Sequence, residues 1–351
     1  MRTDSSTALG GGHLMRCLAL ADRLRQTGAE VIFICRDLPG QLSRLAVDRG
    51  FGTSILPGEP GQSDWQSDAE QTLTTLSGRQ PIDWLIVDHY GLDLRWERML
   101  RSKVGRIMVI DDLADRPHDC ELLLDQNLTD RPANRYDSLT PPHCRKLLGL
   151  KYAILRQEFH DLRPRASARD GRLRRILVSF GGGDITGETE KALAAIRLAG
   201  CDDIAVDVVI GGANRRRTEI ETSARSMPHV RVHVQTTDMA GLMVSADLTL
   251  GGGGISTWER CLLGLPAIVV IQAENQRESI EAAVRQGVLW NMGWHQEVTA
   301  DMMAGQIEYL CERPTIVRAT AEKAWSLMAE AAQDNGRSVV AAIMERAYVA
   351  S

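Results

Sequence analysis

Short runs of β-branched and aliphatic residues alternate with longer segments of helical periodicity along the whole chain. In the first half, buried strands are predicted at residues 31–35, 84–87 and 107–110. A helix is predicted from the glycines at 10–12 to about Thr27, because apolar residues recur on one helical stripe. The stripe consists of Leu14, Cys17, Leu18, Ala21 and Leu24. Alternation of this kind is typical of βαβ units built around a parallel sheet.

A second alternating series follows a polar stretch near the middle of the chain. Residues 161–174 lack the apolar pattern and are predicted to be a domain linker. The segments from Thr299 onward are predicted to be helices. Before them, strands are predicted at residues 176–180, 206–210, 230–234, 248–250 and 267–271. The sequence therefore predicts an α/β protein with two Rossmann-like domains, residues 1–160 and 175–351, that face a cleft.

The first strand of the N-terminal domain is the element that does not fit this pattern. Only Met1, Arg2 and Thr3 precede Asp4, whereas a Rossmann-like half should begin with a buried strand that leads into its first glycine turn. A missing central strand would leave backbone groups and apolar neighbours unpaired. We therefore expect either a stunted first strand or, as the favoured hypothesis, a true start codon upstream.

Composition and charge narrow the choice of partner and compartment. The 351 residues are 44% hydrophobic and 25% charged, as in ordinary globular proteins, and the net charge is -5. Nothing in this balance attracts nucleic acid or anionic lipid, so we expect a small-molecule partner, no nucleic acid and no membrane. No apolar run approaches the roughly 18 residues of a membrane helix, and residues 1–6 lack the apolar core of a signal peptide. We therefore expect a cytoplasmic protein whose seven scattered cysteines are reduced.

The strongest local signal for chemistry is Leu9-Gly10-Gly11-Gly12-His13, which opens the first predicted helix. Glycines there let a ligand approach the backbone, and the free N–H groups of a helix start favour an anionic or electron-rich partner. The same helix end disfavours a positive imidazole, so we expect His13 to be neutral near pH 7 and able to accept a proton. The alternative is an ordinary βα turn with a polar first-turn histidine, because the segment does not match G-x-G-x-x-G. Spacing alone leaves both interpretations open.

A second glycine turn joins a predicted strand to a helix at Gly251-Gly252-Gly253-Gly254-Ile255-Ser256-Thr257-Trp258-Glu259. Four successive glycines can expose several backbone N–H groups to a phosphate or a diphosphate. The turn is not a Walker loop, because it lacks Gly-Lys-Ser/Thr. Ser256-x-x-Glu259 also matches a capping box, so the alternative makes both residues helix caps without a ligand role.

Further polar residues follow predicted strands. Asp88-His89-Tyr90 and Asp111-Asp112 each come directly after a buried strand, and ligands of open parallel sheets bind outside the carboxyl ends of strands. Phe180-Gly181-Gly182-Gly183-Asp184 is a third strand-to-helix glycine turn, which a tight turn alone explains. Asn275-Gln276 follows the strand that ends at Ile271 and offers amide groups, although the bare sequence favours an ordinary loop there.

A metal site is a weaker alternative. His118, Cys120, His143 and Cys144 together offer two nitrogens and two sulfurs. Their spacing fits no common zinc pattern, and Pro141-Pro142 predicts a rigid turn. We therefore expect loop residues and free thiols here, and neither a metal nor another cofactor in the protein.

Several motifs together resemble one enzyme family along nearly the whole chain. The first is Arg2-x-Asp4-x-Ser6 followed by Leu9-Gly10-x-Gly12-His13-x-x-Arg16-Cys17-x-x-Leu20-Ala21. The later ones are Asp88-His89-Tyr90-Gly91, Ile110-Asp111-Asp112-Leu113, Leu124-x-Gln126-Asn127, Tyr152-Ala153-Ile154-Leu155-Arg156-x-Glu158-Phe159, Phe180-Gly181-Gly182-x-Asp184 and Glu274-Asn275-Gln276. Their identity and order resemble the UDP-2,4-diacetamido-2,4,6-trideoxy-beta-L-altropyranose hydrolases of pseudaminic acid biosynthesis. The departures are the clipped first strand and the run of glycines at 251–254, where a more varied loop of small residues is expected.

The resemblance implies a fold similar to the glycosyltransferase-B enzymes. It implies that His13, in the N-terminal domain, is the base that activates water, and that Tyr90 and Asn275 line the sugar site. Asp4 is expected to contribute to the same site by orienting His13.

For the C-terminal domain, the resemblance implies nucleotide binding. By analogy with the transferases, Glu259 would hold the ribose diol. The backbone around Gly253, Gly254 and Ser256 would receive the diphosphate.

The implied reaction is hydrolysis of a UDP-activated diacetamido-trideoxy sugar by attack of water at the anomeric carbon, with inversion. One alternative is a glycosyltransferase of the same fold that uses a UDP-sugar donor. The N-terminal half shows no strong apolar or basic membrane-facing patch for a lipid-linked acceptor, which favours water. The other alternative is a non-catalytic nucleotide-sugar-binding protein, acting as a partner of glycan-pathway enzymes.

Overall fold

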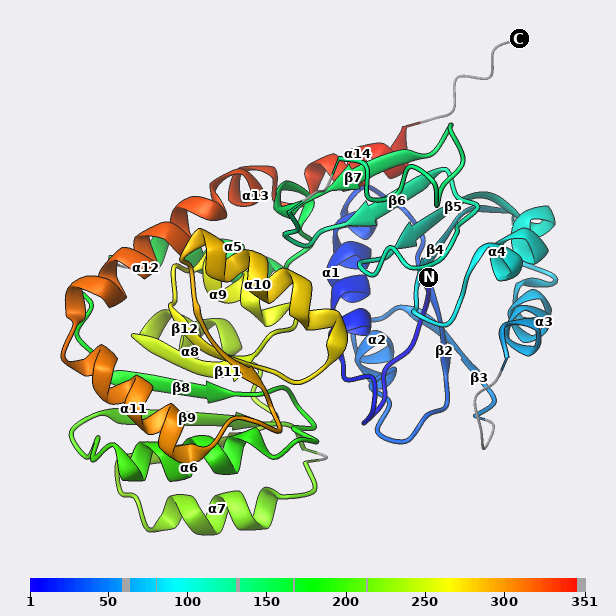
Figure 1. Ribbon diagram of the computed structural model, residues 1–351. Helices are drawn as coiled ribbons and strands as arrows, with labels where there is room; N and C mark the ends of the chain where they lie inside the picture. Colours follow the sequence, from blue (N-terminus) through cyan, green and yellow to red (C-terminus); the bar gives the residue numbers. More distant parts are fainter. Residues whose placement is uncertain (59–63, 80, 131–132, 167, 213, 346–351) are drawn as a thin grey trace. The chain divides into compact units, whose positions relative to one another are not determined.

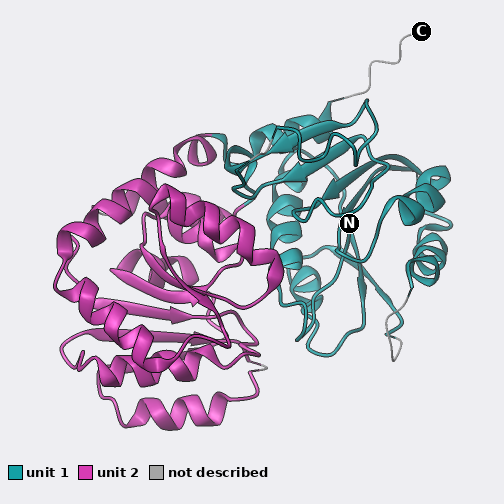
Figure 2. Ribbon diagram, viewed as in Figure 1, with its two compact units in different colours: residues 1–154, 334–351 teal, residues 155–333 magenta. Residues whose placement is uncertain are grey.

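The computed structural model describes residues 1–58, 64–79, 81–130, 133–166, 168–212 and 214–345. The chain forms two compact units, one of residues 1–154 with 334–351 and the other of residues 155–333 (Figure 2). Each unit is built around its own parallel sheet with helices packed on it (Figure 1). The predicted α/β class with two Rossmann-like domains is therefore confirmed.

In the described part of the first unit, the strands form one parallel sheet in the order β3-β2-β1-β4-β5-β6-β7. The strands are β1 Arg2–Thr3, β2 Ile32–Arg36, β3 Gly52–Leu56, β4 Ile82–Asp88, β5 Val104–Ile110, β6 Leu122–Asp125 and β7 Arg145–Leu148. The helices are α1 Gly12–Gln26, α2 Arg44–Asp48, α3 Trp65–Leu76, α4 Leu94–Leu100 and α14 Arg337–Met344, with 3-10 turns η1 Arg101–Lys103 and η2 Leu150–Tyr152.

Both faces of this sheet are buried, which explains its nearly continuous apolar strands. Ile86 of β4 packs in one core cluster together with Leu18 of α1 and Val339 of α14. Its neighbours Leu85 and Val87 pack in the other cluster, on the side of α3 and α4. The alternation follows from the period of two along a strand, and it places helices on both faces.

The short first strand lies at the centre of the sheet. Arg2 pairs with Ile34 of β2 on one side and with Val87 of β4 on the other, and Thr3 pairs with Asp88. The strand is therefore stunted but present. Because β1 and β4 run parallel and end at the same edge, the turn after β1 and the residues after β4 meet there.

The second unit contains a parallel sheet in the order β10-β9-β8-β11-β12-β13 among its described residues. The strands are β8 Arg175–Ser179, β9 Ala205–Ile210, β10 Val230–Val234, β11 Leu248–Gly252, β12 Ala267–Ile271 and β13 Trp290–Trp294. The helices are α5 Gln157–Leu162, α6 Glu188–Leu198, α7 Arg217–Arg225, α8 Met239–Ser245, α9 Ser256–Leu262, α10 Arg277–Gln286, α11 Ala300–Cys311, α12 Pro314–Leu327 and α13 Ala329–Asp334, with 3-10 turns η3 Arg163–Arg165 and η4 Glu274–Gln276.

The predicted linker at 161–174 differs from the observed boundary, which falls near residue 154. Arg163 and Arg169 are packed into the second unit; Ser167 lies outside the described residues. Arg169 donates hydrogen bonds to the carbonyl oxygens of Met243, Ala246, Leu263 and Gly264. Burial lowers the pKa of Arg169 to about 10. Arginines that bind backbone carbonyls in this way have the same sequence signature as a solvated linker, which explains the difference.

The predicted C-terminal boundary also differs, because the chain returns to the first unit near residue 334. Val339 and Ile343 of α14 are buried in the core of that unit. Trp84 Nε1 donates to the Ile343 carbonyl at 2.7 Å, and Arg23 Nε donates to the Asn335 carbonyl at 2.9 Å. The sequence predicted this helix but contained no signal for which sheet it covers.

None of the helices in the described part of the chain combines the length and the apolar character that crossing a membrane requires.

Candidate functional site

His13 lies in the first turn of α1, at the edge where β1 and β4 end. The turn before α1 is allowed by Gly10, whose φ of +73° is in the left-handed region that favours glycine. Neither a side-chain cap nor an acidic first-turn residue neutralises this helix start. The His13 side chain is 11% exposed, so it remains accessible from one side.

The carboxylate of Asp88 holds the imidazole of His13. Asp88 Oδ1 lies 2.6 Å from His13 Nδ1, and Arg16 donates to the same carboxylate through Nε at 2.9 Å and Nη2 at 2.8 Å. Burial by itself would raise the pKa of Asp88, but Arg16 and His13 outweigh it and hold this pKa well below its usual range. An ionised carboxylate only accepts hydrogen bonds, so the proton is on Nδ1 and Nε2 is left as the acceptor nitrogen.

Asp4 does not have the orienting role expected for it. Its carboxylate accepts from Arg2 at 2.5 and 2.8 Å and from the backbone N–H of Arg36 at 2.7 Å. His89 Nε2 lies 3.4 Å from the same carboxylate. Asp4 is only 2% exposed and its oxygens are engaged, so it anchors the turn after β1, and Asp88 takes the place beside His13. Contact between Asp4 and a substrate stays a prediction.

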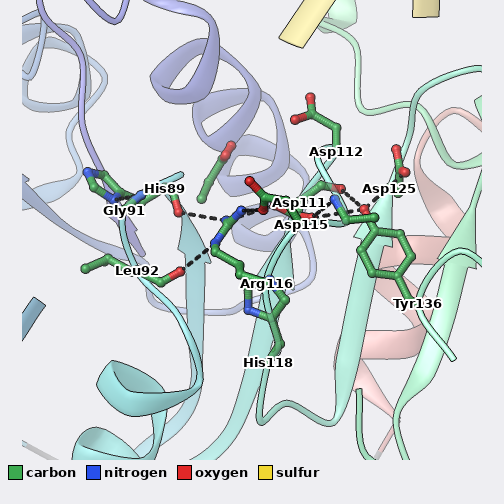
Figure 3. A network of polar contacts seen from close by, with 12 residues as sticks. His89, Gly91, Leu92, Asp111, Asp112, Asp115, Arg116, His118, Asp125 and Tyr136 are labelled. Carbon is green, nitrogen blue, oxygen red and sulfur yellow. Dashed lines mark hydrogen bonds and ion pairs between the residues drawn. The ribbon is translucent and has the colours of Figure 1, made fainter. Parts of the chain in front are cut away.

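Tyr90 is held against His13 by the turn that follows β4. The two rings meet edge to face, with centroids 4.6 Å apart and planes at 82°. Arg116 fixes this turn from below, because it donates to the carbonyls of His89 at 3.2 Å and Leu92 at 3.0 Å and pairs with Asp111 at 2.8 Å (Figure 3). Tyr90 therefore belongs to a turn whose backbone is held in place by hydrogen bonds from Arg116.

Three more carboxylates, those of Asp111, Asp112 and Asp125, lie at and after the ends of β5 and β6 (Figure 3). The Tyr136 hydroxyl lies 3.1 Å from Asp111 and 3.2 Å from Asp125. Burial raises the pKa of Asp125 to about 7, and it also raises the pKa of Asp112. The carboxyl groups of Asp112 and Asp125 therefore retain their protons at higher pH than ordinary carboxylates do.

The residues of the metal alternative have other partners. His118 Nδ1 lies 2.7 Å from Glu97, and the sulfurs of Cys120 and Cys144 are 3.5 Å apart. His143 is 60% exposed. Within the described residues, no three His, Cys, Asp or Glu side chains are arranged to hold a metal ion.

The second glycine turn joins β11 to α9 in the second unit. A Cβ at Gly253 would lie 2.7 Å from Ile280 Cγ1, so packing within the unit favours glycine there. A Cβ at Gly252 would lie 2.2 Å from Gln272 Oε1, the end of a flexible side chain that can move away. A Cβ at Gly254 would meet nothing within 4 Å. In the described part of the chain, the backbone N–H groups of Gly254, Ile255 and Ser256 donate no hydrogen bond. The Gly253 N–H points to Gln276 Oε1 at 3.3 Å.

The capping interpretation of Ser256 and Glu259 is not supported by the geometry. The N-cap position of α9 is Ile255, and no side chain caps it. Glu259 instead accepts from Arg156, with Nε 2.8 Å from Oε1 and Nη2 3.0 Å from Oε2. The two side chains form a forked ion pair in which Glu259 is 5% exposed.

A buried arginine donates hydrogen bonds to the glycine turn and to the start of α9. Arg260 is 1% exposed, and its Nη2 donates to the Gly252 carbonyl at 2.7 Å and to the Thr257 hydroxyl at 3.0 Å. Burial lowers the pKa of Arg260 to about 10. Its positive charge and the free N–H groups make this side of the turn favourable for an anion.

The remaining predicted residues have clear positions. Asn275 lies in η4, next to Gln276, whose side chain binds the Gly253 and Gln272 N–H groups and so ties η4 to the glycine turn. Asp184 accepts from the N–H groups of Glu188 and Thr189 and caps α6, as a tight turn would predict.

The arginines of both groups had no role assigned from the sequence, although Arg16 and Arg156 stand in the quoted motifs. Arg16 lies three residues after His13, one helical turn away, which is a usable signal for a shared partner. The pairing of Arg156 with Glu259 joins residues far apart in the sequence, so the sequence gave no signal for it.

Comparison with known proteins adds sequence relatives of three kinds. The UDP-2,4-diacetamido-2,4,6-trideoxy-beta-L-altropyranose hydrolase of Campylobacter jejuni is 25% identical over 82% of this chain and 96% of its own length. The predicted resemblance to this hydrolase is confirmed. The spore coat polysaccharide biosynthesis protein SpsG of Bacillus subtilis is 30% identical over 45% of this chain and 47% of its own length. An uncharacterized protein of Methanocaldococcus jannaschii is 25% identical over 79% of this chain, and the match spans 56% of that protein. No family model matches the chain.

Solved structures show the same fold at low sequence identity. Acinetobacter baumannii MurG has a TM-score of 0.63 at 14% identity and covers 98% of both chains. WaaG, a glycosyltransferase involved in lipopolysaccharide biosynthesis, has a TM-score of 0.55 at 13% identity, over 96% of this chain and 97% of its own. Anabaena HepE, solved with UDP and glucose, has a TM-score of 0.59 at 13% identity, over 98% and 99%. The chain thus has the glycosyltransferase-B-like fold. The sequence similarity to the Campylobacter hydrolase supports an enzyme of nucleotide-sugar processing.

Proposed function

We propose that the protein is a hydrolase that releases UDP from a UDP-activated diacetamido-trideoxy sugar by attack of water at the anomeric carbon. The observation that carries the proposal is the 2.6 Å contact between His13 Nδ1 and the buried carboxylate of Asp88. This contact reserves Nε2 for accepting a proton, as a general base requires. Similarity to the Campylobacter hydrolase over nearly all of that protein supports the same reaction.

In this mechanism, His13 takes a proton from the attacking water. The water oxygen forms a bond to C1 while the bond from C1 to the diphosphate oxygen breaks, and its electron pair leaves with UDP. Asp88 stabilises the imidazolium that forms, and Arg16 keeps Asp88 ionised. Attack opposite the leaving group inverts the configuration at C1.

The second unit is assigned to the nucleotide. UDP is a good leaving group, so stabilising its charge replaces much of the work of a general acid. The free N–H groups of Gly254, Ile255 and Ser256 would bind the diphosphate, and the charge of Arg260 would add to the effect. Glu259 would accept hydrogen bonds from the ribose, and Tyr90 and Asn275 would contact the sugar. Gly253 would contribute by shaping the turn, because its N–H points to Gln276.

A glycosyltransferase is the second candidate, and the similarity in fold to WaaG favours it. It would use the same donor with an acceptor hydroxyl in place of water. A non-catalytic binding protein for nucleotide sugars would bind the donor and release nothing.

Product analysis in ¹⁸O-labelled water distinguishes these functions. The purified protein is incubated with the UDP-diacetamido-trideoxy sugar without an acceptor, with a His13→Asn variant as the control. We expect equimolar UDP and free sugar, with the label in the sugar and none in the UDP, and proton NMR should show the inverted anomer first. UDP release that requires an added acceptor would identify a transferase, and stable UDP-sugar would identify a binding protein.

A further inference from the structure

The motif Arg156-x-Glu158-Phe159 has no role in the mechanism above, yet its arginine is fully engaged. Arg156 Nε and Nη2 donate to the two oxygens of Glu259, at 2.8 and 3.0 Å. Its Nη1 donates to Glu158 at 2.8 Å, and the guanidinium lies 4.5 Å over the ring of Phe159. The plane of the guanidinium is therefore fixed by the motif, and Glu259 is fixed by the guanidinium.

The geometry leaves Glu259 able to bind more than Arg156. Each carboxylate oxygen has two lone-pair positions, and the fork uses one on each oxygen. One position therefore remains on each of two adjacent oxygens, which matches a pair of neighbouring hydroxyl groups. Glu259 is only 5% exposed, and a buried carboxylate is stable in the charged form only with a partner such as Arg156.

We propose that Arg156 is a positioning residue that orients the Glu259 carboxylate toward the 2′- and 3′-hydroxyls of the ribose and so makes the second unit selective for ribonucleotides over 2′-deoxyribonucleotides. The inference rests on the proposed function, in which Glu259 faces the ribose. Arg156 itself does not touch the nucleotide.

The planar fork is what the role requires. Lysine would keep the positive charge but offers a single ammonium that cannot hold both oxygens in one plane. Arg156→Lys therefore preserves the pairing of charges and removes the orientation. Glu158→Gln is the matched control, because it disrupts the other ion pair of the same guanidinium, at a residue that is 41% exposed. Exposed pairs contribute little, so this control should leave Glu259 in place.

The test is calorimetric measurement of the dissociation constants of UDP and 2′-deoxy-UDP for the parent protein and for each variant. We expect the parent and Glu158→Gln to prefer UDP by at least about tenfold, in the range of one or two lost hydrogen bonds to a charged group. In Arg156→Lys, and in Arg156→Gln as a second variant in case the first does not fold, this preference should fall to about twofold or less. Turnover of the UDP-sugar should show a raised KM with a nearly unchanged kcat.

The outcomes separate the inference from the function it rests on. Equal weakening of both ligands in the folded variants, with the preference retained, would show that Arg156 is only structural and would overturn the inference. A parent that binds UDP and hydrolyses the sugar without preferring UDP over its deoxy form would overturn the inference and leave the hydrolase proposal intact. A parent that binds neither nucleotide would overturn both.

Discussion

At His13, the start of α1 and the carboxylate of Asp88 act on the imidazole in opposite directions. A helix N-terminus disfavours a positive ring, whereas an ionised carboxylate at 2.6 Å stabilises one. Arg16 shares that carboxylate and offsets its charge. Asp88 thus holds the ring in one tautomer, while Arg16 reduces the attraction of the carboxylate for a positive imidazolium. This suits a group that must accept a proton and then lose it.

Replacing Asp88 tests this arrangement. Asp88→Asn removes the charge that stabilises the imidazolium and allows the wrong tautomer, so kcat should fall at least about 10-fold while KM for the UDP-sugar changes little. Steady-state UDP release measures both constants, and circular dichroism checks the fold. A variant with the kcat of the parent would show that Asp88 has no part in the chemistry.

Substitutions at two neighbouring glycines distinguish a role in packing from a role in binding the diphosphate. The methyl group of Gly254→Ala would meet nothing within 4 Å, so the free energy of unfolding should change by less than about 0.5 kcal/mol. If the diphosphate lies against this backbone, the same methyl group should lower UDP affinity several-fold. Gly253→Ala is the matched control, because its methyl group would press on Ile280 and should lower stability by about 1–3 kcal/mol. Thermal unfolding and calorimetry measure the two effects. Full UDP affinity in Gly254→Ala would remove the diphosphate from this turn.

At the scale of elements, parallel strands gather carboxylates at one edge of the first sheet. Asp88 ends β4, Asp111 follows β5 and Asp125 ends β6. Arginines from helices and loops compensate them, so the pattern visible in the sequence as isolated acids becomes one buried ionic group. Asp88 and Asp111 could be predicted from strand ends, whereas Asp125 could not, because β6 was not predicted. Among the arginine partners, only Arg16 had a signal in the sequence, its position one helical turn after His13.

This group predicts a pH dependence of stability. The pKa of Asp125 is about 7, above its ordinary value of 3.8, so the folded state holds a proton that the unfolded state has lost. The stabilisation is complete below pH 4 and is lost as the pH rises toward 7, by at most about 4 kcal/mol. Between pH 5 and pH 8, Tm of the parent should therefore fall more than Tm of Asp125→Asn, which keeps the neutral form at every pH. Parallel curves for the two proteins would contradict the assignment.

Substitutions in helix α14 test whether this helix packs in the core of the first unit. Ile343 is 4% exposed in the core of that unit, whereas the next residue, Met344, is 44% exposed. Ile343→Ala should lower the free energy of unfolding by about 2–4 kcal/mol, and Met344→Ala by less than about 0.5 kcal/mol. Denaturant unfolding measures both. Equal, small effects would mean that α14 does not belong to this core.

At the scale of the whole molecule, the alternation of apolar runs predicted the class of fold and the strands at 230–234 and 267–271 as observed. It did not predict β3, β6, β7 or β13. The strands β6 and β7 are only four residues long, and β3 and β13 are edge strands whose residues are mostly not buried. The domain boundaries differed because arginines at 163 and 169 bind carbonyls of the second unit and because the last helix packs on the first sheet. These contacts join residues far apart in the sequence, so they cannot be predicted from local composition.

The central claim, that His13 activates water, is tested most directly by the rate of UDP release from the saturating UDP-sugar by His13→Asn, measured beside its affinity for UDP. We expect kcat to fall at least about 100-fold with UDP affinity nearly unchanged, as for the loss of a general base. A variant that binds UDP normally and releases it from the sugar at the rate of the parent would contradict the account.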